Sequence, residues 1–176
     1  MVFTPDVSDA LGAAAELANS AQDPDALETL AELTEFFDRW QYTGRRPRTR
    51  ADLDAMREAR PLLRAMLTAD RETAVELVNT VLAEQQAIPQ LVRHDHLDWH
   101  VHAIDEDRPL PERVLVETAM ALIDLVRADE MERLGICAAS DCDAVVVDFS
   151  RNRSRKFCST TCGNREAQAA YRARQG

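Results

Sequence analysis

Residues 158–174 of the chain are CSTTCGNREAQAAYRAR, in which two cysteines enclose three residues directly before a stretch with the composition of a short basic helix. A second pair, Cys137 and Cys142, encloses four residues, and fifteen residues separate the two pairs. All four cysteines of the chain therefore lie within one span of 26 residues. In a reducing compartment, such a cluster favours a metal site over disulfide bonds.

Two close cysteine pairs joined by a longer connection match the tetrahedral site of zinc, in which each sulfur lies about 2.3 Å from the metal. With four thiolates bound, no position remains for water or substrate, so the zinc would be structural. Neither pair has the two-residue gap of thiol-disulfide redox motifs, and four buried thiols without a metal are the remaining alternative. We expect one Zn²⁺ ion held by Cys137, Cys142, Cys158 and Cys162.

The segment between the pairs predicts a two-stranded ribbon. Residues 144–149 (AVVVDF) are rich in strand-forming residues, SRNRS is a polar turn, and residues 155–157 (RKF) return to the third cysteine. A helix is expected over residues 163–174. This order is that of a treble-clef-like zinc finger, in which metal binding, on the order of 10–16 kcal/mol, would supply most of the folding free energy.

Charge is divided unevenly along the chain. The net charge is −10, yet residues 1–133 carry 27 acidic and 14 basic side chains, whereas residues 134–176 carry 4 acidic and 7 basic ones. Screening limits exposed charges to a range of about 10 Å at moderate salt, so the basic tail presents its own local field. Arginine suits both phosphate and the guanine edge, which makes the tail a candidate nucleic-acid contact surface. The seven candidate residues are Arg151, Arg153, Arg155, Lys156, Arg165, Arg172 and Arg174.

Helical periodicity dominates the first two-thirds of the chain, where apolar residues recur at spacings of three and four. Pro61 falls inside the third stretch and should kink or split that helix. The last stretch, between Pro111 and Gly135, carries two apolar stripes and should be the most buried element. The expected helices span residues 7–18, 23–43, 49–67, 70–88 and 111–135.

Between the last two helices the apolar period changes to two. In residues 97–104 (LDWHVHAI), four apolar residues alternate with polar ones, which predicts a strand whose apolar face carries Trp99 and Val101. Its expected partner is the preceding run, QLVRH. The sequence thus predicts a small antiparallel sheet within a mainly helical region.

Length and composition limit the number of domains. At 176 residues and 45% hydrophobic composition, the chain can bury one solid core plus a small appendage. We expect an α+β chain with a helical N-terminal domain over residues 1–133 and the finger over residues 134–176. No run approaches the roughly 20 apolar residues that span a bilayer, and no secretory signal pattern begins the chain, which predicts a cytoplasmic protein without a membrane partner.

The four histidines lie within nine residues, and His100 and His102 share one side of the predicted strand. Two imidazoles at this spacing can bind a metal, with His96 or Asp98 completing the set, which would allow metal-assisted hydrolysis. The alternative is a solvated or partly buried strand face beside a pocket. Whether His94, His96, His100 and His102 hold a second metal stays open. No nucleophile motif or phosphate-binding glycine loop occurs in the sequence, and we do not expect an enzyme.

Cys162-Gly163-Asn164-Arg165 is the CGNR signature, and residues 134–174 resemble the CGNR zinc finger over its whole length. The upstream part is similar to the ABATE domain, which precedes this finger in bacterial proteins labelled putative stress-induced transcriptional regulators; the matching segments are ALGAAAELANS, ARPLLRAML, the DWHVH strand and the AMALIDLV helix. The resemblance implies a mostly helical sensing domain tied to a DNA-binding finger. For Asn164 we expect a role in capping or bracing the finger.

Three functions fit these features, and the first is favoured. The first is a transcriptional regulator that binds DNA through its finger and responds to a small-molecule ligand or protein partner through its helical domain; binding to paired half-sites would suit a homodimer. The second is a zinc-stabilised module that binds RNA or another protein. The third is a metalloenzyme that uses the histidine strand.

Overall fold

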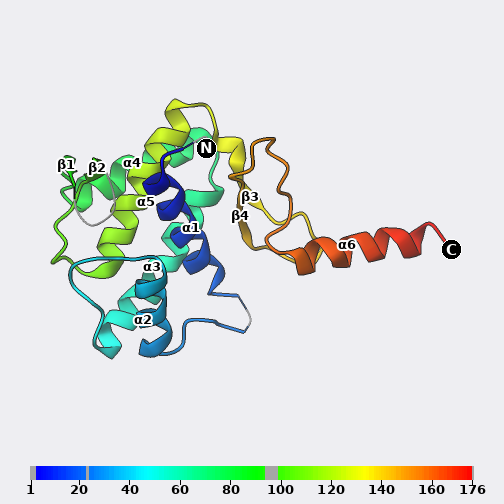
Figure 1. The fold of residues 1–176 in the computed structure, drawn as a ribbon, viewed down its shortest axis with the longest axis horizontal. Coiled ribbons are helices and arrows are strands. Elements are labelled where there is room, and N and C mark those ends of the chain that lie inside the picture. The colour runs from blue at the N-terminus through cyan, green and yellow to red at the C-terminus, as the bar shows by residue number, and fades with distance from the viewer. Residues whose placement is uncertain (1–2, 23, 94–98, 176) are drawn as a thin grey trace.

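The computed structural model of the protein describes residues 3–22, 24–93 and 99–175. Within these ranges the chain forms six α-helices, one 3₁₀ helix and two antiparallel sheets of two strands each, which confirms the α+β class (Figure 1). In the described residues no helix has the length and apolar character needed to cross a bilayer. The elements are α1 (Pro5–Asn19), α2 (Leu30–Arg39), α3 (Arg50–Thr68), α4 (Arg71–Glu84), β1 (Gln90–Val92), β2 (His100–His102), α5 (Leu110–Arg127), η1 (Met131–Arg133), β3 (Leu134–Ile136), β4 (Val145–Val147) and α6 (Thr160–Ala173).

The helical body is built around α5, which packs against α1, α3 and α4. Eleven of its 18 residues are buried, more than in any other described helix, so the prediction that this element is the most buried is confirmed. The helix ends earlier than expected, at Arg127, because the chain turns through Asp129 in the left-handed conformation (φ 56°) and then forms η1.

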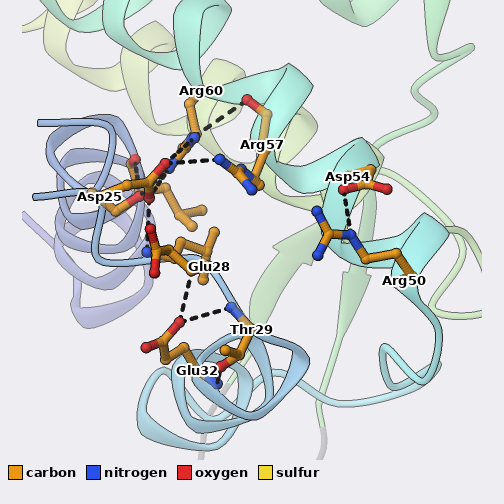
Figure 2. A network of polar contacts seen from close by, with 11 residues as sticks. Asp25, Glu28, Thr29, Glu32, Arg50, Asp54, Arg57 and Arg60 are labelled. Carbon is orange, nitrogen blue, oxygen red and sulfur yellow. Dashed lines mark hydrogen bonds and ion pairs between the residues drawn. The ribbon is translucent and has the colours of Figure 1, made fainter.

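The beginning of α2 is set by a capping box, and this corrects the expected start at residue 23. The Thr29 hydroxyl accepts a hydrogen bond from the Glu32 backbone N–H, and the Glu32 carboxylate accepts one from the Thr29 N–H, so the helix starts at Leu30. Upstream, Asp25 bridges to α3 and pairs with Arg60 and Arg57 (Figure 2). The hydrogen bond from Arg60 is the main reason that the pKa of Asp25 is lowered to about 2.

Pro61 does not split α3, which runs without interruption from Arg50 to Thr68. The proline ring is exposed, whereas the neighbouring Arg60 and Leu63 are buried. Packing of this buried face against α1 and α5 holds the helix together across the hydrogen bond that proline cannot donate.

The first sheet pairs β1 with β2, in the register Leu91 opposite Val101, which confirms the expected partner. The predicted orientation of β2 was wrong. Trp99 is 64% exposed and Val101 38%, whereas His100 on the opposite face is 9% exposed. The histidine side of the strand faces a cavity in the helical body that is lined by charged as well as apolar residues, so it is the polar side that turns inward. Leu97, His94, His96 and Asp98 lie outside the described residues.

The second sheet pairs β4 with β3, in the register Gly135 opposite Val146, so the expected pairing of residues 144–149 with residues 155–157 was wrong. Both faces of β4 are buried. Val145 and Val147 belong to the core of the helical body, whereas Val146 packs in a second core with Cys137 and Cys162. The expected domain boundary at residue 134 stays a prediction.

Polar contacts fix the second sheet and its following loop to the helices. Arg64 donates to the Asp143 carbonyl at 2.6 Å, and the buried Arg133 donates to the Asp148 and Ser150 carbonyls at 3.0 and 2.9 Å. Asn19, the last residue of α1, binds the backbone of Val145. In Figure 1 the ribbon of β3 and β4 lies against the helical body, and α6 extends away from it toward the C-terminus.

Candidate metal centre and nucleic-acid interface

The four cysteines come together in one cluster, with all four Sγ atoms within 4.8 Å of one another. The Sγ atoms of Cys142 and Cys158 are 3.7 Å apart, and those of Cys158 and Cys162 are 3.5 Å apart. A tetrahedral zinc site with Zn–S bonds of about 2.3 Å separates its sulfurs by about 3.8 Å. The donor atoms therefore fit the ion, and the cluster is consistent with one structural zinc.

Local backbone geometry brings the second cysteine pair together. Ser159 caps α6, and its hydroxyl accepts a hydrogen bond from the Cys162 N–H at 3.2 Å, so Cys162 lies in the first helical turn with its sulfur toward Cys158. The helix therefore begins before the fourth cysteine, at Thr160, rather than at residue 163. Gly163 has a packing role, since a Cβ there would lie 3.3 Å from the Phe157 ring.

Two of the cysteine sulfurs accept hydrogen bonds from N–H groups, which favour the thiolate form that binds a metal cation. The Cys158 N–H donates to Cys137 Sγ at 3.4 Å, and Arg165 donates to Cys162 Sγ at 3.4 Å. Burial, followed by the neighbouring sulfurs, raises the pKa of Cys158 to about 12. Burial also acts to raise the pKa of Cys137, but backbone N–H groups of Ala139 and Cys158 outweigh it and lower that pKa to about 7. Four thiolates this close require a compensating metal charge.

The loop between the first two cysteines is held to α6 by two polar contacts. The Glu166 carboxylate accepts hydrogen bonds from the Ser140 N–H at 2.9 Å and the Ser140 hydroxyl at 3.0 Å, and Arg165 pairs with Asp141 at 2.5 Å. Sequence analysis missed Glu166, which has no distinguishing pattern around it. The Asn164 side chain is exposed and makes no hydrogen bond with another described residue, so the bracing expected of it is performed by Arg165 and Glu166.

Three of the seven basic candidates form ion pairs or hydrogen bonds with other residues of the protein. Arg153 forms ion pairs with Glu130, at 2.8 Å, and with Glu132. Arg155 donates to the Cys158 carbonyl at 2.9 Å, beside the metal cluster. Together with Arg165, these side chains hold the finger in shape.

The other four candidates are exposed and form no ion pair with any residue that the structure describes. They are Arg151, Lys156, Arg172 and Arg174. Arg172 lines a shallow hollow on α6 with Tyr171, Gln168 and Asn164. Because α6 projects from the body in Figure 1, this face is open to a large partner.

Comparison with known protein families finds two matches, one over the zinc finger and one over the helical body. Residues 133–175 match the CGNR zinc finger, and residues 11–129 match ABATE, a family described as a putative stress-induced transcription regulator. The second match covers well over half of the chain. The chain belongs to the ABATE family. The resemblance expected from the sequence is thereby confirmed, with both matches in the expected order, and no curated protein matches the chain.

Membership of ABATE gives a coarse function. The family is one of putative transcription regulators, the CGNR finger is a metal-binding module, and neither is typically an enzyme. Among the described residues, the four cysteines form the only group of three or more side chains that could hold a metal. A second metal at the histidine strand would involve His94 or His96, which lie outside the described residues, so that question stays open.

The ABATE region contains a cavity of about 790 Å³ that sequence analysis did not locate. Its walls come from α1, α5, β2 and the segment after α2. His100 and His102 line it, with their Nε2 atoms 3.1 Å apart, which matches the alternative of a partly buried strand face beside a pocket. Residues from position 6 to position 127 contribute to the lining, so no local motif marks the cavity.

Two carboxyls that line this cavity have a raised pKa. For Asp9 the causes are burial and then the neighbouring charge of Asp6. Burial raises the pKa of Glu117 to about 7, against the opposing effects of the Arg113 charge and a hydrogen bond from Tyr42.

Trp40 is fixed in the cavity wall by two contacts. Its indole N–H donates to Glu16 at 3.0 Å, and its ring lies over Gly12, where a Cβ would be only 2.5 Å from the ring.

Proposed function

We propose that this ABATE protein is a transcription regulator that binds DNA through its zinc finger and whose helical body binds a small molecule in its cavity. The observation that carries the DNA-binding part is the exposed basic surface of α6 and the preceding turn. Arg151, Lys156, Arg172 and Arg174 have no ion pair among the described residues, although the chain as a whole has a net charge of −10.

The zinc site supports this proposal by providing a rigid base for α6. The helix is joined to the cysteine cluster through Cys162 and to the loop of the first pair through Glu166. Its outer part and the residues that follow it, 167–175, are exposed throughout. A fixed helix that carries arginines without internal partners suits the phosphate backbone of a duplex.

The ligand-sensing part is supported by the volume and walls of the cavity. A volume of about 790 Å³ is within the range of about 300–1,000 Å³ that is usual for small-molecule sites. Helix α1 lines the cavity with Val7 and Ala13 and contacts β4 through Asn19. A ligand that shifts α1 would therefore act on the sheet that carries the finger, which is a physical route for coupling the two sites.

The test is duplex-DNA binding by the purified, zinc-quantified protein across a salt series. We expect affinity to fall steeply with salt, with a log-log slope of about −0.9 for each neutralised phosphate. Removal of zinc by a chelator should abolish binding, because α6 then loses its attachment at Cys162. No binding even at low salt would refute the DNA-binding proposal and redirect the search to an RNA or protein partner.

A further inference from the structure

The cavity of the helical body contains the carboxyl of Glu117. The neighbouring cation, Arg113, uses its N–H groups in hydrogen bonds to other residues. Glu117 lies on α5 one turn after Arg113, which is 3% exposed. The Arg113 guanidinium donates to three backbone carbonyls, those of Thr43 at 2.5 Å, Arg45 at 2.6 Å and Arg108 at 3.1 Å. Arg113 thus fixes the loop after α2, and these N–H groups donate to backbone carbonyls rather than to Glu117.

The remaining charged groups around the cavity leave it acidic. Five carboxyl residues and three arginines line it. Of the arginines, Arg39 is already paired with Glu16, which is outside the lining, at 2.5 Å, so the carboxyl residues of the lining outnumber its other arginines. A cleft lined by an excess of one charge raises the local concentration of ions of the opposite charge. The charged lining residues are Asp6, Asp9, Glu106, Glu117, Asp124, Arg39, Arg113 and Arg127.

Apolar and aromatic groups form much of the rest of the wall. Trp40 and Tyr42 contribute aromatic rings, and Val7, Val116 and Met120 contribute aliphatic surface. Aromatic rings attract cations through their faces, and apolar walls favour a ligand with a hydrocarbon body. The lining is therefore suited to a molecule that combines both properties.

We propose that the cavity binds a small organic cation with an apolar or aromatic body, whose ammonium group pairs with the Glu117 carboxylate. The proposal names the ligand class for the sensing part of the proposed function and does not depend on DNA binding. A carboxylate ligand would place like charges together at Glu117, and a neutral ligand would leave the acidic lining uncompensated.

Proton linkage follows from this pairing. With the pKa of Glu117 at about 7, part of the protein population is protonated at neutral pH, and a bound cation favours the ionised form. Affinity should therefore rise with pH through about 7, and binding at neutral pH should release protons. His100 and His102 also line the cavity. The other titratable or charged groups that face the cavity are Tyr42, Asp6, Asp9, Glu106, Asp124, Arg39, Arg113 and Arg127.

The experiment is calorimetric titration of the full-length, zinc-loaded protein, without DNA, with three probes that share one ring system. These are 1-naphthylmethylamine, 1-naphthylmethanol and 1-naphthoate, which are cationic, neutral and anionic near neutral pH. We expect the amine to bind about tenfold more tightly than the alcohol, and naphthoate to bind most weakly. The enthalpy measured for the amine should change with the ionisation enthalpy of the buffer, because a proton is released.

Two variants separate a specific carboxylate from the general acidity of the protein. Glu117→Gln should remove the preference for the amine and the buffer dependence, whereas Glu76→Gln, at an exposed site on α4, should leave both unchanged. Circular dichroism checks that each variant is folded. Equal or tighter binding of the alcohol or naphthoate, no measurable binding of the amine, or a preference that survives Glu117→Gln would each overturn the proposal. DNA binding is measured separately, so its failure would leave this result standing.

Discussion

The side chain of Asn19 forms two hydrogen bonds with the backbone of Val145, 126 residues further along the chain. Its Nδ2 donates to the Val145 carbonyl at 2.9 Å, and the Val145 N–H donates to Oδ1 at 2.7 Å. The amide group thus pairs with β4 on the edge that β3 does not use. Because α1 also lines the cavity, one helix touches both the cavity and the sheet that leads to the cysteine cluster.

Replacing Asn19 with alanine should loosen this attachment. Val145 is 2% exposed, so its N–H and carbonyl would lose their partner in a buried position, at a cost of about 1–3 kcal/mol in the free energy of unfolding. Denaturant unfolding measures the loss, and hydrogen exchange at the Val145 amide locates it. The control is Gln22→Ala, which removes an exposed hydrogen bond to Asp143 and should change stability by less than about 0.5 kcal/mol. Unchanged protection of Val145 would contradict the expected role.

Asp25 should be an acid-sensitive contact in the helical body. In Asp25→Asn, Arg60, which is 7% exposed, loses its charged partner, and we expect the free energy of unfolding to fall by about 2 kcal/mol. This is below the cost of about 3–5 kcal/mol for breaking a fully buried pair, because Asp25 is partly accessible. The control Asp54→Asn removes an exposed pair with Arg50 and should cost almost nothing.

The pH dependence of the same contact has a definite sign. The pKa of Asp25 is lowered from 3.8 to about 2 in the folded protein, so its stabilisation is complete above the unfolded value and is lost as pH falls through the folded one. The stability difference between the natural protein and Asp25→Asn should therefore shrink between about pH 4 and pH 2. Urea unfolding across this range measures it, and a constant difference would show that the charge of Asp25 is not responsible.

Cys158→Ser should release the metal and disorder the cysteine cluster together with the start of α6. The helical body should keep its cooperative unfolding, because Val145 and Val147 remain packed in its core. Zinc quantification and thermal unfolding followed by circular dichroism provide the measurement. Since thiols must lose protons to bind zinc, metal affinity should also fall as pH is lowered. A variant that retains one zinc and unfolds like the natural protein would rule out Cys158 as a ligand.

Local signals explain what the sequence could predict. Cysteine spacing identified the cluster because four thiolates this near in sequence need little loop ordering to meet. The double apolar stripe of α5 predicted its burial, since a helix that is apolar on most sides must be covered. The capping box at Thr29 and Glu32 was equally local, and the expected start of α2 at residue 23 overlooked it.

The wrong predictions concern contacts between segments that are far apart in the sequence. Alternation in residues 99–103 shows that β2 has two faces, but the cavity formed by α1 and α5 decides which face turns inward. Three consecutive valines in β4 are typical of a strand buried on both sides, yet they do not identify β3 as the partner. Likewise, residue type alone does not show that Arg153 is paired with Glu130, 23 positions earlier.

Arg172, in the last turn of α6, and Arg174, directly after the helix, should each contribute to DNA affinity. In Arg172→Ala/Arg174→Ala we expect weaker duplex binding and a salt slope reduced by about 1–2, since each phosphate contact contributes about 0.9. Zinc content should not change, because neither side chain touches the cysteine cluster in the described structure.

The matched control for this variant is Arg50→Ala/Arg71→Ala, which removes the same charge from exposed positions on the helical body. If both double variants lose affinity equally, binding follows net charge and α6 is not the contact surface. If only the α6 variant loses affinity, the interaction is local to the projecting helix, as expected for charges whose fields are screened within about 10 Å. Fluorescence anisotropy with a labelled random duplex at low salt provides the comparison.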